Sequence, residues 1–142
     1  MVYDSFDEYK RVDHLIHVTL KYTRTVDIIR SVIKRLISTF DIMFDEIIEW
    51  ALENNKIEAV PKVPLLRAKK METIFKKDDT IKEIIKFYLN LRKIYNSPYK
   101  KKEEYRKNVT LITKMGDINI ETLKTYSQNT KNYLNYLSQL IE

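Results

Sequence analysis

The sequence has no cysteine, one glycine and only three prolines in 142 residues. Without cysteine, the chain can form no disulfide, thiolate nucleophile or cysteine-ligated zinc site. The single glycine, Gly116, excludes a glycine-rich phosphate loop. β-Sandwiches, β-barrels and α/β enzymes with many loops need tight turns, which are rich in glycine and proline. The composition therefore excludes most β-rich architectures and the enzymes that cradle phosphates on glycine.

Long apolar runs are absent as well. No window approaches the ~18 uninterrupted apolar residues of a membrane-spanning helix, and the charged start MVYDSFDEYK is unlike a signal peptide. We therefore expect no membrane association and a cytoplasmic location. Hydrophobic residues make up 44% of the chain, close to the ~45–50% of globular proteins. One domain covering residues 1–142 is expected.

Hydrophobic periodicity predicts an all-α fold. Apolar residues recur at steps of three and four over residues 26–51, the spacing of one face of a long amphipathic helix. Pro64 suits the first turn of a helix, and Thr80 followed by Glu83 is a capping-box pattern. We expect an up-and-down bundle of four to five helices. Besides the long helix, the helical patterns cover residues 9–21, 64–75, 80–95 and 120–141.

The apolar stripe of the long helix is unusually wide, since Ile28, Val32, Ile42, Met43 and Trp50 extend it. A stripe of this width needs partners on two sides. A bundle can supply them, and so can a second copy, so we expect a homodimer built on this helix. The alternative is a structural subunit of a larger complex or a viral component, in which the stripe forms the interface.

A short segment before the last helix has the period of a strand. Val109, Leu111 and Thr113 alternate with their neighbours, and residues 114–117 form a turn candidate before Ile118. This pattern predicts a small β-hairpin. The alternative is a loop that continues into the last helix.

Charge is unevenly distributed along the chain. The net charge is +6, but residues 62–107 carry +9 and residues 1–61 carry −3. Uneven charge of this kind favours a polyanion or an acidic protein as partner. A solvated lysine-rich surface is the alternative. In the acidic part, Asp41, Asp45 and Glu49 lie four residues apart, so they repel on a helix. A solvated face is one interpretation; compensation by basic residues from the middle of the chain or from a partner, or by a divalent cation, is the alternative.

The densest basic segment is residues 92–107, with seven basic residues and three tyrosines in sixteen positions. Lysine and arginine neutralise phosphates, and tyrosine stacks on unpaired bases. RNA is favoured over duplex DNA, because no helix-turn-helix pattern is present. The candidate nucleic-acid-binding residues are Arg92, Lys93, Tyr99, Lys100, Lys101, Lys102, Tyr105, Arg106 and Lys107.

The two histidines, His14 and His17, share a helix face with Asp13 nearby. A metal site needs three or four ligands of fixed geometry, and the sequence offers no clear third ligand within range. We therefore expect no metal and no other cofactor.

The segment RKIYNSPY at residues 92–99, at the end of a helix in a short basic all-helical chain, resembles the HEPN family. HEPN domains are small helical bundles, often dimeric, that act as RNA-cleaving toxins or as partners of nucleotidyltransferases in toxin–antitoxin and defence systems. Arg92 matches the arginine of their motif and Tyr99 the tyrosine. The histidine position falls on Ser97, which argues against RNA cleavage at this site, because no group there titrates near neutral pH.

The sequence thus predicts a non-enzymatic, HEPN-like binding or accessory module that contacts RNA or an acidic protein through its basic segment. The alternative is a metal-independent RNase of HEPN type, because Arg11 and His17 satisfy the same motif spacing within the first helix. In that alternative, Arg11 and His17 are the catalytic residues and act across a dimer interface.

Overall fold

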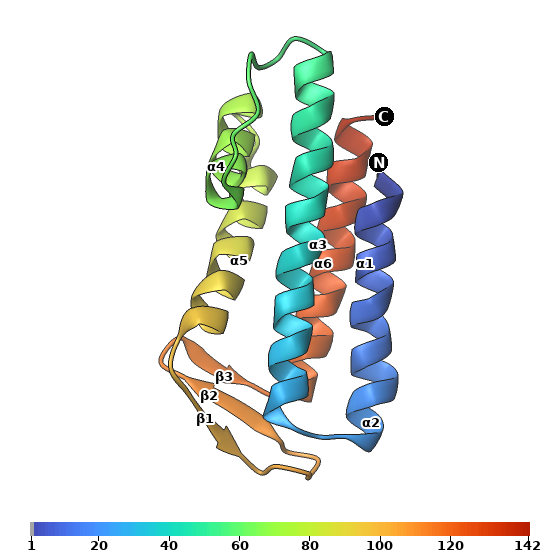
Figure 1. The fold of residues 1–142 in the computed structure, drawn as a ribbon, viewed down its shortest axis with the longest axis vertical. Coiled ribbons are helices and arrows are strands. Elements are labelled where there is room, and N and C mark those ends of the chain that lie inside the picture. Colours follow the sequence, from blue (N-terminus) through green and yellow to red (C-terminus); the bar gives the residue numbers. More distant parts are fainter. Residues whose placement is uncertain (1) are drawn as a thin grey trace.

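The long helices alternate in direction to form an up-and-down bundle, with a three-stranded antiparallel sheet at one end and both chain ends near the other (Figure 1). The structure is a computed structural model that describes residues 2–142. Its helices are α1 (Val2–His14), a π-helix (Leu15–Thr19), α2 (Leu20–Tyr22), α3 (Val26–Glu53), α4 (Pro64–Ile74), α5 (Asp79–Asn96) and α6 (Ile120–Leu140). The strands are β1 (Tyr99–Lys102), β2 (Thr110–Thr113) and β3 (Gly116–Ile118).

The predicted helical bundle is confirmed, but the starts of two helices differ from the prediction. The first helix begins at Val2 rather than near Tyr9. The N-cap of α5 is Asp78, two residues before the predicted cap at Thr80, because the Asp78 side chain accepts a hydrogen bond from the Ile81 amide at 3.1 Å. An aspartate carboxylate is a strong N-cap, so it sets the helix start in place of the threonine.

The π-helix at Leu15–Thr19 was not predicted. The buried residues Val12, Ile16 and Leu20 lie four apart in sequence. In an ordinary α-helix, side chains four residues apart shift steadily around the helix axis, so this row would gradually leave the core. A π-helix has more residues per turn, which keeps side chains four apart closer to the same face. The π-helix therefore lets the end of the first helix stay packed on the bundle.

Helix α3 lies at the centre of the bundle and packs against α1, α4, α5 and α6. Its apolar stripe is buried within the single chain. The width that led us to expect a homodimer is therefore explained by partners on several sides in the same molecule, and the dimer itself stays a prediction. The buried apolar residues of α3 are Val26, Ile29, Val32, Ile33, Leu36, Ile37, Phe40, Met43, Phe44, Ile47, Ile48 and Ala51.

Aromatic rings fill the middle of the core. The Phe40 ring on α3 lies 5.9 Å from Phe44, 5.9 Å from Phe87 on α5, and 6.5 Å from Tyr133 on α6, measured between centroids. Aromatic pairs at such separations add to the free energy of simple burial. Phe40 therefore joins three helices at one point.

The small sheet contains the predicted hairpin and one strand that was not predicted. β2 and β3 form the hairpin, with Leu111 opposite Ile118 on the face buried against the bundle. β1 is the lysine-rich stretch at Tyr99–Lys102, paired with β2 so that Lys101 lies opposite Leu111. The strand order β1-β2-β3 places β1 at an edge. Lysines at an edge strand discourage pairing with other chains.

One carboxylate is buried in the bundle. Glu46 is 8% exposed between α1 and α3, and the Ser5 hydroxyl donates to its Oε2 atom at 3.4 Å. Burial raises the pKa of Glu46 to about 6. The folded state therefore favours the protonated form more than the unfolded chain does.

This burial predicts a pH-dependent stability. The contribution of neutral Glu46 is complete below the unfolded pKa and is lost as the pH rises through about 6, a loss of about 2 kcal/mol. We expect the free energy of unfolding of the wild type, relative to Glu46→Gln, to fall by this amount between weakly acidic and neutral pH. Urea denaturation of both proteins across this range measures it, and a constant difference between them would contradict the assignment.

No helix within residues 2–142 is long and apolar enough to span a membrane.

Candidate nucleic-acid interface

The loop between β1 and β2 is fastened to the short linker between α2 and α3. The Glu104 Oε2 atom accepts a hydrogen bond from the Val26 amide at 2.9 Å, and the Tyr105 amide donates to the Arg24 carbonyl at 2.7 Å. Glu104 thereby satisfies an amide at the start of α3, where a negative charge is favourable. The contacts join two segments about 80 residues apart into one continuous surface.

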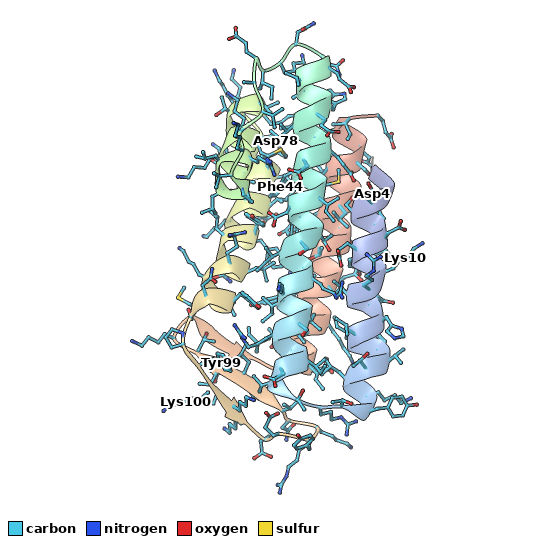
Figure 2. The ribbon with its side chains drawn as sticks, in the orientation of Figure 1. Asp4, Lys10, Phe44, Asp78, Tyr99 and Lys100 are labelled. Atoms are coloured by element: carbon cyan, nitrogen blue, oxygen red, sulfur yellow. The ribbon has the colours of Figure 1, made fainter. Side chains whose placement is uncertain are left out.

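We call this region the sheet-end surface. Figure 2 shows Tyr99 and Lys100 at this end of the molecule, whereas the labelled Asp78 lies towards the other end. The surface is defined by Lys21, Tyr22, Arg24, Lys100, Lys102, Tyr105, Arg106 and Lys107.

Two tyrosine rings project from the sheet-end surface into solvent. Tyr22 is 80% exposed and Tyr105 is 77% exposed. Tyr105 also has a left-handed backbone conformation, with φ of 66°, which costs a non-glycine residue about 1 kcal/mol. A strained tyrosine with an exposed ring adds nothing to the core. Its side chain is therefore available for a ligand.

Several of the predicted basic residues lie on the sheet-end surface. Lys100, Lys102 and Lys107 are exposed, and within residues 2–142 they take part in no ion pair. Arg106 is exposed and pairs only locally, with its Nη1 atom 3.8 Å from Glu103 Oε2. Together with Tyr105, these residues form one exposed cationic group.

Tyr99 and Lys101, also predicted to bind nucleic acid, lie on the face of β1 turned towards α3. The Arg30 guanidinium is 4.4 Å from the Tyr99 ring centroid and 4.5 Å from that of Tyr95. The Lys101 Nζ atom is 3.3 Å from Asp27 Oδ1, and its hydrogen bond to Asp27 raises the pKa of Lys101. Both side chains therefore help to hold the sheet on the bundle.

Arg92 contacts residues of the helical bundle rather than lying on the sheet-end surface. Its Nη1 atom donates to the Tyr88 hydroxyl at 3.1 Å and lies 3.8 Å from Asp41 Oδ2. Tyr88 in turn donates a short hydrogen bond to Asp41. Burial raises the pKa of Asp41, although Tyr88 and Arg92 oppose the rise. Lys93 is exposed on α5, in a pocket shared with residues of α4 and α5 rather than with the loop.

Two of the three predicted carboxylates of α3, Asp41 and Asp45, have basic partners within the chain. Arg92 lies beside Asp41, and the Arg67 Nη1 atom on α4 is 2.9 Å from Asp45 Oδ1. Both basic partners come from the middle of the chain, which was one of the alternatives predicted. These pairs use part of the positive charge of that region, whereas the lysines of the sheet-end surface remain exposed.

Arg11 and His17, the alternative catalytic pair, line different pockets. Arg11 lies beside His14 and Arg35, with its Nη1 atom 3.8 Å from Glu8 Oε2. His17 lies in the π-helix, 3.4 Å from Asp13, in a pocket that it shares with Arg24. At the resembling motif, the Ser97 hydroxyl donates to the Lys93 carbonyl at 2.6 Å. No group of three or more metal-ligating side chains occurs in the part of the chain that the structure describes.

Sequence reasoning missed Lys21, Tyr22 and Arg24 as interface residues. Their one signal was their position in or next to the predicted break between the first two helices, where side chains leave the packed face. The contacts of Tyr105 with Arg24 and of Glu104 with Val26, which join residues far apart in sequence, show that this break adjoins the basic segment.

Exposed apolar side chains gather at the opposite end of the bundle, around the loop after α3 and the start of α4. A structural-subunit role would use this surface rather than the covered stripe of α3. Its residues are Leu52, Val60, Val63, Leu65 and Leu66.

Comparison of the chain with known protein families, with curated proteins and with solved structures found no match. The resemblance to HEPN domains therefore stays a prediction from residues 92–99 and the helical character of the chain.

Proposed function

We propose that the protein is a non-enzymatic, HEPN-like helical accessory module that binds single-stranded RNA on its sheet-end surface. The observation that carries the proposal is the pair of exposed tyrosines, Tyr22 and Tyr105, joined through Arg24 and surrounded by lysines without ion-pair partners among the described residues. Aromatic rings that stack on bases, beside cations that neutralise phosphates, are the two elements of single-strand binding.

The exposed rings favour RNA over an acidic protein as the partner. An acidic protein surface can be met by lysine and arginine alone, so it gives no reason to hold Tyr105 in a strained and solvent-exposed position. Unpaired bases do give a reason, because every base has a face for stacking. Duplex DNA is less suitable, because α2, the helical part of this surface, is only the last turn of the helical stretch from Val2 to Tyr22, and its Leu20 is buried in the bundle. It therefore offers no separate recognition helix to a groove.

Binding without cleavage is favoured by the placement of Arg11 and His17. A metal-independent RNase that acted within one chain would need both side chains at one phosphate, but they line separate pockets. If the RNase alternative holds, His17→Ala abolishes cleavage of single-stranded RNA. We expect no cleavage by the wild type that depends on this residue.

Replacing Tyr105 should change the affinity for RNA without lowering the stability of the fold. Tyr105→Asn removes the ring, but asparagine tolerates the left-handed backbone well, so stability should stay equal or rise by up to about 1 kcal/mol. Loss of one base-stacking ring should weaken RNA binding about tenfold. Fluorescence anisotropy with a labelled oligouridylate and thermal unfolding measure the two effects.

Leu66→Asn is the matched control, because Leu66 is 51% exposed on α4, at the opposite end of the bundle. It should leave RNA affinity unchanged. The proposal is wrong if Tyr105→Asn and Leu66→Asn bind RNA equally well, or if the wild type binds no RNA at low salt.

A further inference from the structure

Two pockets adjoin at the sheet end, with Arg24 and Ile120 in the wall that they share. The first has a volume of about 180 Å³ and lies against the π-helix, with His17 and Lys21 in its lining. The second has a volume of about 310 Å³ and is bounded by Lys107 and the start of α6. Arg24 therefore lies between the two pockets and lines both of them.

The charge in these pockets is strongly positive. Lys21, Arg24, Lys107 and Lys124 come to them from α2, the α2–α3 linker, the β1–β2 loop and α6. The single carboxylate in the linings belongs to Glu121, whose Oε1 atom is 3.4 Å from Lys124 Nζ.

Among residues 2–142, Lys21, Arg24 and Lys107 have no ion-pair partner. Cations that converge in a concave space repel one another, and an anion that enters relieves the repulsion. The charge and shape of the pockets therefore favour an anionic ligand.

The linings also offer neutral groups that suit a nucleotide. Asn108 and Asn119 line the second pocket beside Lys107. The Asn119 Oδ1 atom is engaged, since it accepts the Thr122 amide at 2.9 Å as the cap of α6. The amide nitrogen of Asn119 therefore stays available as a donor. A volume of about 310 Å³ lies at the small end of small-molecule sites and suits a single nucleotide.

We propose that the paired pockets bind one nucleoside monophosphate unit, with Arg24 as the phosphate ligand at the shared wall. Lys21 and Lys107 flank the phosphate, and the second pocket holds the nucleoside. The guanidinium of arginine matches a phosphate with two parallel hydrogen bonds. The inference rests on the proposed function when the unit belongs to an RNA strand, but the same chemistry would accept a free nucleotide.

The test is a titration of the isotope-labelled protein with uridine 5′-monophosphate, inorganic phosphate and uridine, followed by NMR. Uridine monophosphate should shift the amide signals of residues around Arg24, Lys107 and Asn119, and uridine should not. Arg24→Met should weaken this binding at least tenfold. Lys107→Met, at an exposed loop position, tests the same site without disturbing the linker. Lys76→Met, which removes an equal charge from an exposed position beyond α4, is the control and should bind as the wild type does.

Competition with a labelled oligouridylate separates the two sources of the nucleotide. If uridine monophosphate displaces the oligonucleotide and Arg24→Met weakens both, the pockets hold a nucleotide of the bound strand. If the mononucleotide binds and the oligonucleotide does not, the pockets are a free-nucleotide site and the proposed function is wrong. If the oligonucleotide binds but the mononucleotide does not, or if neither Arg24→Met nor Lys107→Met weakens binding of the mononucleotide, the pocket inference is overturned. The proposed function then stands as long as the wild type binds the oligonucleotide.

Discussion

Affinity for single-stranded RNA should fall about 10²-fold as monovalent salt rises from about 50 to about 200 mM, if roughly five phosphates are neutralised. The sheet-end surface supplies six cations, enough for about five such contacts: Lys21, Arg24, Lys100, Lys102, Arg106 and Lys107. Each phosphate contact on a single strand releases bound counterions, so the logarithm of affinity falls linearly with the logarithm of salt concentration. Fluorescence anisotropy at several salt concentrations measures the slope.

The slope of RNA affinity against salt concentration also tests which lysines contact the RNA. Replacing Lys100, Lys102 and Lys107 together by serine should reduce the slope by about two, since each contact contributes ~0.7. The matched control replaces Lys69, Lys76 and Lys77 by serine, which removes the same net charge from exposed positions in and just after α4. If both triple variants lower the slope equally, binding follows overall charge and the sheet-end surface has no special role.

Phe40→Ala should destabilise the protein by about 3–5 kcal/mol. Phe40 is completely buried on α3, and its ring contacts aromatic rings of α3, α5 and α6. The alanine would lose these contacts and leave a cavity where three helices meet. Since a domain is usually stable by only ~5–15 kcal/mol, urea denaturation should show a much lower midpoint.

Leu66→Ala is the comparison for this prediction, because Leu66 is half exposed on α4. Surface changes of this kind usually alter stability by less than about 0.5 kcal/mol. A loss below about 1 kcal/mol for Phe40→Ala would be far smaller than the usual cost of deleting a core phenylalanine, and it would contradict the packing of α3 against α5 and α6.

The helices were predictable because their signals are local. The three-to-four spacing of apolar residues in α3 and the proline at the start of α4 act within a few turns of chain. The hairpin of β2 and β3 was predictable for the same reason, since Leu111 and Thr113 alternate with more exposed residues before a tight turn. These features depend on neighbours in sequence.

β1 was not predictable from its own residues. YKKK has no apolar alternation and no β-branched side chain, and the segment is a strand because it pairs with β2. Strand formation at an edge follows from the partner strand more than from intrinsic preference. The same limit applies to Arg92, whose place beside Asp41 and Tyr88 depends on how α5 packs on α3.

The candidate interface was predictable in part. The exposed lysines at 100, 102 and 107 follow from the run of basic residues, because such runs usually stay in solvent. The contributions of Tyr22 and Arg24 depend on the hydrogen bond between Tyr105 and Arg24, which joins distant segments. No local pattern encodes such a contact.

NMR mapping of a short oligouridylate on the labelled wild-type protein is the most direct test of the RNA-binding surface. We predict amide shifts concentrated at residues 21–25, 100–108 and 119–124, with little change along α4. Shifts centred on α4 and the exposed apolar residues around Leu66, or no shifts at low salt, would contradict single-stranded RNA binding at the sheet end.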